Sequence, residues 1–243
     1  MTTVGRFAPS PTGPLHLGSL VAALGSWVFA RRTGGRWLVR MEDLDTARVI
    51  EGAAEGILET LRRYGLQWDG EVVYQSQRIA LYEQAMKTLD AMGLVYDCGC
   101  SREELCECRN GIPQGRVARA VRFRMPDDVI EFDDSLCGRI RAPSDDFIVK
   151  RADGIFAYQL AVVVDDAEQG VTQIVRGADL LSSTPRQIAL QRALGLPTPE
   201  YAHVPLALNA DGTKISKREG AVPLDPDRIE ETLEQAYRIL GFR

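Results

Sequence analysis

Compact apolar runs alternate with amphipathic stretches over the first part of the chain. Residues 3–8 (TVGRFA) and 36–43 (RWLVRMED) are short apolar runs bordered by turn-forming residues, which predicts two strands. Residues 18–32 between them predict a helix, because four apolar side chains fall on one face: Leu20, Leu24, Trp27 and Val28. Two more helices are predicted by the stripes Ile57/Leu61/Tyr64 and Leu81/Ala85/Leu89. Strands that alternate with helices favour an α/β fold, with a parallel sheet covered on both faces.

This pattern changes near Leu94. From there to residue 148 the chain has cysteines, a turn sequence (RNGIPQG) and short strand-like runs (AVRFRM and FIVKR). We interpret residues 94–148 as an inserted small subdomain. Residues 1–93 and 149–243 are then the two halves of the larger domain.

The second half of the larger domain has three predicted elements. The apolar run at residues 156–166 (FAYQLAVVVDD) predicts a buried strand. Residues 183–195 predict a helix that Ser183 or Thr184 caps and Gly195 ends. A last helix is expected from about Pro226, because an apolar stripe follows it: Ile229, Leu233, Ala236 and Leu240.

Composition narrows the class of protein. The 243 residues are 45% hydrophobic and 26% charged, which is ordinary for a globular chain. With a formal charge of -5, a nucleic-acid partner has to be met by a local basic face. No apolar run approaches the roughly 20 residues that cross a bilayer, and the N-terminus lacks an apolar signal core. We therefore expect a cytoplasmic protein with no membrane contact.

The stretch from Ala8 to Leu20 (APSPTGPLHLGSL) has the features of an anion site. It joins the first predicted strand to the first helix, where unpaired N–H groups attract phosphate. Gly18 allows close approach, Ser19 caps or donates, and His16 faces whatever binds the helix start. A P-loop is excluded, since the residue after Gly18 is Ser19 rather than lysine. The simpler alternative is a proline-rich turn with an exposed histidine.

A second candidate lies at residues 211–220 (DGTKISKREG). Lys214 and Lys217 flank Ser216 on a glycine-bordered loop, which suits a leaving pyrophosphate. Taken alone, a loop with this lysine spacing is usually a solvated surface turn.

Together, HLGS and KISKR resemble the two signature motifs of the class I aminoacyl-tRNA synthetases. Four further stretches resemble the glutamate-specific branch of that class: RFAPSPTGPLHLGSL, RMEDLDTAR, YQLAVVVDD and IVRGADLL. The resemblance implies a Rossmann-like catalytic domain that binds ATP with Mg²⁺. It implies that the ATP site consists of His16, Gly18, Ser19, Lys214, Ser216 and Lys217, with His16 and Lys217 catalytic.

The same resemblance implies a site for L-glutamate. Arg6 would pair with the substrate's side-chain carboxylate, an arrangement to which a guanidinium is well suited, and Ala8 and Ser10 would form the adjoining wall. Glu42 would take the α-ammonium, with Tyr158 and Arg176 completing the site. The simpler alternatives are a strand-end acid for Glu42 and a surface ion pair for Arg176.

The region after KISKR distinguishes branches of the family. Only residues 219–243 follow it, with one predicted helix and no anticodon-binding domain, whereas full glutamyl-tRNA synthetases continue with a large helical domain. This resembles the glutamyl-queuosine tRNA(Asp) synthetases. The resemblance implies transfer of glutamate to queuosine in the anticodon loop of tRNA(Asp). The size of the chain allows a monomer, which we expect. A candidate RNA-binding patch, or a merely solvated basic face, is Arg116, Arg119, Arg122 and Arg124.

Four cysteines predict a zinc site in the inserted segment: Cys98, Cys100, Cys106 and Cys108. The family typically has Cys-x-Cys followed by a tyrosine and a third cysteine, but here Ile112 and Arg116 stand near those positions. A degenerate site with free thiols is therefore the alternative. We expect Cys137 to be a packing residue.

Other functions remain open at this stage. The chain could charge the 3′ end of tRNA(Glu), glutamylate a small molecule or protein, or sense glutamate or a nucleotide without catalysis. The intact phosphate motifs speak against a sensor. A glutamine pocket could also look similar in sequence.

Overall fold

The computed structural model describes residues 2–100, 108–126, 129–208, 215 and 222–242. Within these ranges, no helix is long and apolar enough to cross a membrane. The strands are β1 (Val4–Phe7), β2 (Arg36–Met41), β3 (Val73–Tyr74), β4 (Val95–Cys98), β5 (Ala120–Phe123), β6 (Val129–Asp134), β7 (Gly138–Pro143), β8 (Phe147–Lys150), β9 (Gln173–Gly177) and β10 (Glu200–Val204). The α-helices are α1 (Leu17–Arg31), α2 (Ala53–Arg63), α3 (Ile79–Ala91), α4 (Tyr158–Glu168), α5 (Thr184–Ala193) and α6 (Ile229–Leu240). The 3₁₀ turns are η1 (Thr46–Arg48), η2 (Gln75–Gln77), η3 (Cys108–Asn110) and η4 (Ala178–Ser183).

Parallel strands form the centre of the molecule. β1, β2 and β3 pair in parallel in that order, and β9 pairs in parallel with β10. β1 lies beside the start of β9, because the Thr172 amide donates to the Val4 carbonyl at 2.9 Å. The first strand of the chain is therefore interior, between its second strand and a strand from the last third of the sequence.

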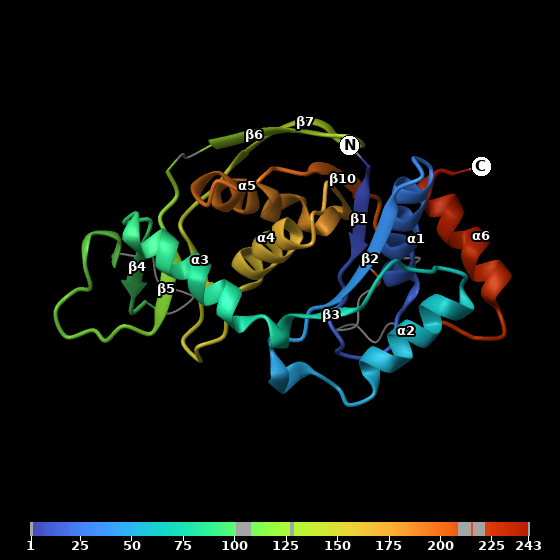
Figure 1. Cartoon of the computed structure of the whole chain (residues 1–243), viewed down its shortest axis with the longest axis horizontal. Helices are drawn as coiled ribbons and strands as arrows, with labels where there is room; N and C mark the ends of the chain where they lie inside the picture. Colours follow the sequence, from blue (N-terminus) through green and yellow to red (C-terminus); the bar gives the residue numbers. More distant parts are fainter. Residues whose placement is uncertain (1, 101–107, 127–128, 209–214, 216–221, 243) are drawn as a thin grey trace.

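Helices cover both faces of these strands. α1 and α6 pack on one face, whereas α4 and α5 lie on the other, as Figure 1 shows. Alternate strand residues serve the two apolar cores: Val175 and Ala202 face the α1 side, while Ile174 and Tyr201 face the α4 side. The predicted α/β fold with a parallel sheet covered on both faces is confirmed.

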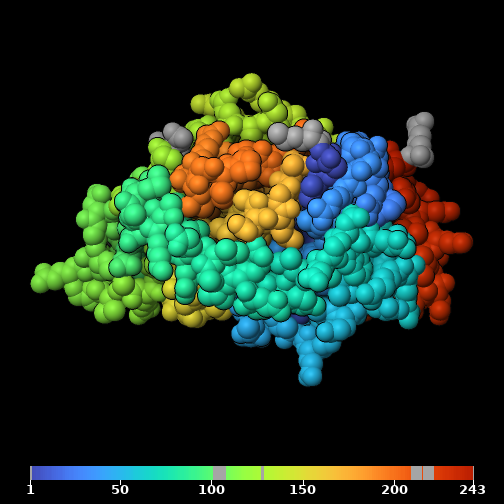
Figure 2. All heavy atoms as spheres, in the orientation of Figure 1, coloured from blue at the N-terminus to red at the C-terminus, as the bar shows by residue number. Residues whose placement is uncertain are grey.

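The segment between α3 and α4 is antiparallel. β4, β5 and β8 form a three-stranded sheet at the end of the molecule away from α6 (Figure 1). Figure 2 shows this part projecting from the rest of the surface. The β6–β7 hairpin turns back instead, and β6 pairs in parallel with β10 where Asp134 meets Tyr201. A hairpin from the middle of the sequence thus reaches the edge of the central strands.

The strand predicted at residues 156–166 is wrong, because α4 occupies Tyr158–Glu168. Residues 160–166 are all buried, so this helix has no solvent-exposed face over that stretch. A segment apolar on every side has no period that separates helix from strand, and three consecutive valines favour the strand. The buried aspartates at its end, Asp165 and Asp166, pair with arginines from other elements.

Other local predictions had mixed outcomes. α5 forms as expected and Gly195 has a positive φ of 66°, but neither Ser183 nor Thr184 caps the helix with its side chain. The Thr184 hydroxyl is used instead by Arg176, which donates to it at 2.8 Å. Cys137 is exposed in the turn between β6 and β7, so its expected packing role is wrong.

Candidate functional site

A cavity of about 630 Å³ opens where the ends of β1, β2, β9 and β10 meet the start of α1. Nine residues predicted from the sequence line it: Arg6, Ala8, Ser10, His16, Gly18, Ser19, Glu42, Tyr158 and Arg176. The other three, Lys214, Ser216 and Lys217, lie outside the described residues. Ile215, which stands between them in the sequence, also lines the cavity.

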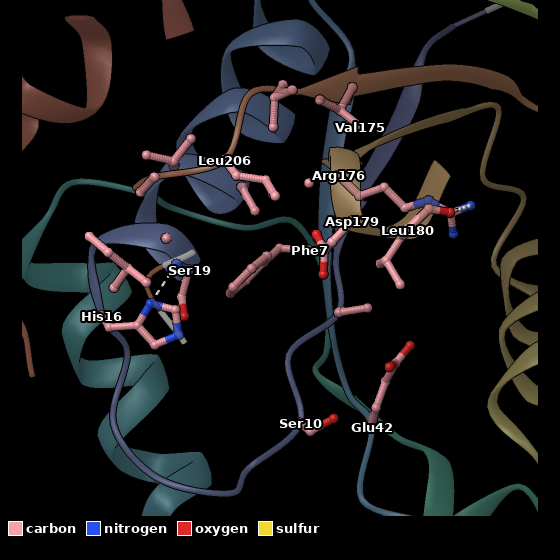
Figure 3. Close-up of a pocket in the computed structure, with 18 of the residues that line it drawn as sticks. Phe7, Ser10, His16, Ser19, Glu42, Val175, Arg176, Asp179, Leu180 and Leu206 are labelled. Atoms are coloured by element: carbon pink, nitrogen blue, oxygen red, sulfur yellow. Dashed lines mark hydrogen bonds between the residues drawn. The ribbon is translucent and has the colours of Figure 1, made fainter. Parts of the chain in front are cut away.

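His16 is the N-cap of α1. Its Nδ1 accepts a hydrogen bond from the Ser19 amide at 3.3 Å. In a neutral ring this places the proton on Nε2. Figure 3 shows His16 and Ser19 on one side of the cavity, with Phe7 between them and the opposite wall. The helix start therefore offers an imidazole donor beside its first-turn amides.

The space around Gly18 at this helix start is tight. A Cβ at this position would lie 3.1 Å from the His16 ring and 3.2 Å from the carbonyl oxygen of Ile215. The Ile215 amide donates to the Ala207 carbonyl at 2.9 Å. The described residue of the second motif is thereby fixed against the first motif, although the two are some 200 residues apart in the sequence.

Arg6 is held by a buried carboxylate. Its Nε and Nη2 donate to Asp166 at 3.0 and 3.3 Å, and only 3% of the residue is exposed. Asp166 also pairs with Arg40 at 2.9 Å. Burial raises the pKa of Asp166, but the attraction of Arg6 and Arg40 outweighs it, and the net pKa is lowered. Asp166 therefore stays ionised and orients Arg6 at the cavity wall.

Glu42 lies at the end of β2 with its side chain 12% exposed. Its Oε1 is buried and has no hydrogen-bond partner in the described structure; the nearest cation, Arg40 Nη2, is 3.8 Å away. Burial raises the pKa of Glu42 to about 7, although Arg40 and Arg6 act to lower it. A carboxylate left this incompletely paired is a suitable partner for an ammonium group from a ligand.

Arg176, at the end of β9, is a buried cation that neutral groups surround. It is 4% exposed, and its guanidinium donates at distances of 2.8 to 3.5 Å to His203, Tyr158, Gln187, Leu180 and Thr184. The bonds to Tyr158 and Leu180 are the long ones, at 3.3 and 3.5 Å. A charged arginine that lines a cavity and is bonded to neutral groups favours an anionic ligand.

His203 and Asp134 were not predicted from the sequence. His203 on β10 is 2% exposed; its Nδ1 lies 2.6 Å from Asp134 Oδ2, and its Nε2 accepts from Arg176 Nε at 3.1 Å. The one available signal was rarity, since the chain has only two histidines. Nothing in the sequence places Asp134 beside position 203.

A buried charge network behind the site was also missed. Arg40 is fully buried between Asp165, Asp166 and Glu42. Burial lowers the pKa of Arg40, but the three carboxylates outweigh it and keep the group charged. Asp165 in turn accepts from Gln75, Arg78 and Tyr82. The adjacent aspartates at the end of an apolar run were the signal available for this network.

Three of the predicted metal ligands come together. The sulfur atoms of Cys98, Cys100 and Cys108 lie within 4.8 Å of one another, and those of Cys100 and Cys108 are 3.5 Å apart. In a tetrahedral zinc site with bonds of about 2.3 Å, ligand sulfurs are about 3.8 Å apart, so these residues fit the ion. Cys106 lies outside the described residues.

The predicted basic patch is only half available to a partner. Arg116 and Arg119 are exposed, whereas Arg122 and Arg124 are half-buried. Arg122 donates to the Asp146 carbonyl and Arg124 to the Arg109 carbonyl. The inner pair therefore supports this subdomain.

Comparisons with known proteins agree with this site. Residues 2–119 and 113–234 match the family described as the catalytic domain of class I tRNA synthetases (E and Q). The glutamyl-Q tRNA(Asp) synthetase of Geobacter sulfurreducens is 54% identical over 93% of this chain and 78% of its own length. That of Thiobacillus denitrificans is 55% identical over 98% of this chain and 85% of its own length.

Solved structures show the same fold. A glutamate tRNA ligase from Elizabethkingia meningosepticum, in complex with its amino acid, matches 90% of this chain with a TM-score of 0.79 and 31% identity. The match spans 53% of that ligase, or about half its length. The methionyl-tRNA synthetase of Mycobacterium tuberculosis, at 14% identity and a TM-score of 0.65, shares the fold alone. The chain therefore belongs to the class I tRNA synthetases (E and Q), and among them to the glutamyl-Q tRNA(Asp) synthetase family.

Proposed function

We propose that this chain is a ligase that activates L-glutamate with ATP and transfers the glutamyl group to queuosine in the anticodon loop of tRNA(Asp). The observation that carries the proposal is that one cavity contains a helix N-terminus, two buried arginines and an incompletely paired carboxylate. Phosphate and a dicarboxylic amino acid need these groups side by side. The relatives with 51–55% identity carry the corresponding name.

The amino acid is placed by charge. The side-chain carboxylate pairs with Arg6. Arg176 and Tyr158 complete this anion-binding pocket, beside Ala8 and Ser10. The α-ammonium pairs with Glu42. Two cationic groups at the side-chain end favour glutamate over glutamine, since an uncharged amide gains less from them.

Activation joins two substrates without a protein nucleophile. An α-carboxylate oxygen attacks the α-phosphorus of ATP, the bond from that phosphorus to the bridging oxygen breaks, and pyrophosphate leaves. His16 Nε2–H and the first turn of α1, including Gly18 and Ser19, stabilise the phosphate oxygens as charge develops. Mg²⁺ enters with ATP and neutralises its phosphates.

The second motif stabilises the leaving group. Lys217, with Lys214 and Ser216, pairs with the departing pyrophosphate. Lys217→Ala should lower the activation rate by orders of magnitude and leave glutamate affinity little changed, measured by pyrophosphate exchange. An unaltered rate would remove Lys217 from this role.

Transfer completes the reaction. A queuosine hydroxyl oxygen attacks the glutamyl carbonyl carbon, loses its proton and displaces AMP. Residues 94–148 would act as an inserted subdomain between catalytic halves 1–93 and 149–243. There Cys98, Cys100, Cys108 and Cys106 would hold a structural zinc ion, and Arg116 and Arg119 would contact the RNA.

The cellular setting follows from these substrates. ATP and tRNA are both present in the cytoplasm, where we place the reaction. The size of the chain allows a monomer, which we propose as the catalytic unit.

The deciding experiment is glutamate-dependent ATP–pyrophosphate exchange without RNA, followed by labelled glutamate with tRNA(Asp) that has or lacks queuosine. Exchange without RNA and transfer only to the queuosine form support the proposal. Exchange that needs tRNA(Glu) would identify a charger of tRNA 3′ ends. No exchange under any condition would identify a sensor.

A further inference from the structure

We propose that Asp134 is a positioning residue for glutamate: it fixes the tautomer of His203, and through that ring the orientation of the Arg176 guanidinium. The inference rests on the proposed function, because Arg176 is one of the residues assigned to the amino acid. It extends the site to the β6–β7 hairpin, which none of the sequence motifs includes.

The two carboxylate oxygens of Asp134 have different hydrogen-bond partners. Oδ1 accepts three backbone amides, from Leu136 at 3.1 Å, Cys137 at 2.9 Å and His203 at 3.2 Å. Oδ2 lies 2.6 Å from the His203 Nδ1, and the Cys137 thiol also interacts with this carboxylate. Burial raises the pKa of Asp134, but these hydrogen bonds outweigh it and lower the pKa, so the group is a carboxylate.

An ionised Asp134 determines where the proton of His203 sits. Burial lowers the pKa of His203 below its ordinary value. The ring is therefore neutral at neutral pH and has one N–H. Because a carboxylate can only accept, that proton lies on Nδ1. Nε2 is then a lone pair, directed at Arg176 Nε at 3.1 Å and the Thr184 hydroxyl at 3.2 Å.

This lone pair fixes one edge of Arg176. His203 holds the Nε–H edge of the planar guanidinium, while Nη1 and Nη2 donate to Gln187 and Thr184 at 2.8 Å. The longer contacts of Nη1 and Nη2, to Tyr158 at 3.3 Å and Leu180 at 3.5 Å, lie on the cavity side. With the proton on Nε2 instead, two donors would face each other across 3.1 Å in a buried site. The guanidinium would then have to turn away from His203.

Asp134→Asn tests the mechanism with a minimal change. The three amides hold the amide oxygen at the Oδ1 position, which turns the new NH₂ toward His203 Nδ1. The ring must then accept at Nδ1 and carry its proton on Nε2. The same logic explains the wrong histidine tautomer produced by an Asp→Asn change in serine proteases.

The matched control is Glu131→Gln on the same strand. Glu131 makes exposed ion pairs with Arg139 and Arg141, away from the cavity. The Glu131→Gln change replaces one carboxylate on β6 by an amide and leaves Asp134, His203 and Arg176 unchanged. We expect wild-type behaviour from it in every measurement below.

The first readout is the histidine tautomer, from ¹⁵N–¹H correlation spectra of the free protein. The chain has only two histidines, and His16→Asn assigns them. His203 should be the Nδ1–H form in the wild type and the Nε2–H form in Asp134→Asn. An Nε2–H form in the wild type overturns the proposal without any variant and without glutamate chemistry.

The second readout is the apparent KM for glutamate in pyrophosphate exchange. Asp134→Asn should raise this KM about tenfold or more, because one buried hydrogen bond becomes a contact between two donors. The kcat should stay within about threefold of the wild-type value. Adding His203→Gln should restore most of the loss, because the introduced amide oxygen can accept from Arg176 Nε whatever stands at position 134. Equal defects in the single and double variants would assign Asp134 to hairpin structure alone and overturn the proposal.

A failure of the proposed function has a different signature. A wild type that shows no glutamate-dependent exchange contradicts that function, while the tautomer spectra still test the Asp134–His203 pairing. Should Asp134→Asn not fold, His203→Met and His203→Gln replace it. Only the first removes the acceptor for Arg176, so only the first should raise KM.

Discussion

His16 lines the cavity, whereas His203 is buried behind the cavity residue Arg176, and their hydrogen bonds assign the two rings opposite tautomers. His16 accepts a backbone amide at Nδ1 and presents Nε2–H to the cavity. His203 donates from Nδ1 to Asp134 and presents a lone pair at Nε2 to Arg176. In the proposed mechanism the first ring donates to the ligand and the second accepts from the protein, although the residue type is the same.

The surroundings explain this difference. The His16 end is made of a helix start and loop backbone, in which few side chains are buried. The Arg176 and Arg6 end is made of buried side chains joined by charged hydrogen bonds. Changes at the first end should act on the rate of activation, and changes at the second on glutamate binding and on stability.

The largest expected effect separates the two roles of His16. His16→Ala should lower kcat for pyrophosphate exchange by about 10² to 10³-fold, the usual loss for one transition-state donor, with little change in KM for glutamate. His16→Asn keeps a capping oxygen for the Ser19 amide but lacks the imidazole donor. A rate near wild type in His16→Asn would assign the ring to capping alone.

The next effect is a pH dependence confined to the glutamate end. Glu42 has a pKa raised to about 7 from 4.5, so below pH 7 it is protonated and lacks the charge that pairs with an ammonium. At saturating ATP, KM for glutamate should rise about tenfold from pH 8 to pH 6 and be flat above pH 8. Glu42→Gln should raise KM at pH 8 and remove this dependence. The same pH slope in Glu42→Gln would assign the titration to another group.

A smaller effect tests the tight packing around Gly18, at the start of α1. Gly18→Ala would place a Cβ 3.1 Å from the His16 ring and 3.2 Å from the Ile215 carbonyl. We expect kcat to fall about three- to tenfold through displacement of these groups. Gly56→Ala in α2 is the control, because its Cβ would meet nothing within 4 Å and should stabilise the helix by about 0.5–1 kcal/mol. Equal activity of both variants would contradict a tight fit at Gly18.

The smallest effect on activation concerns the cysteines. Cys98→Ser should abolish the zinc content measured by elemental analysis, while RNA-independent exchange stays within about twofold of wild type. Cys137→Ser, at an exposed position outside the cluster, should keep the metal. Metal-free wild-type protein with normal stability would contradict a structural zinc ion.

Sequence was sufficient where local pattern and local chemistry coincide. The start of α1 is defined by His16, Gly18 and an apolar stripe, and all three depend on residues in the helix or directly before it. The family resemblance assigned Arg6 and Glu42 to one site, and the parallel pairing of β1 with β2 brings both residues to one cavity. β1 and β2 pair residue by residue from Val4 with Arg36 to Phe7 with Val39, which aligns their ends.

The features that the sequence analysis did not predict depend on contacts between distant segments of the chain. Asp134 reaches His203 across 69 positions, and Asp166 reaches Arg6 across 160. No periodicity encodes such pairs. α4 was misassigned in part for the same reason: its buried aspartates are paired with groups from other elements, so the local sequence looks like an apolar strand.

The interior position of β1 has a consequence for biosynthesis. β2 pairs with one side of β1 early, but its other neighbour begins at Thr172, 168 positions after Val4. At 5–20 residues per second, a ribosome needs about 10 to 30 s to make that span. During this interval one edge of β1 is open to solvent or to a chaperone. Val175 and Val204 on the cavity wall come later still, so the amino-acid pocket is among the last features of the molecule to form.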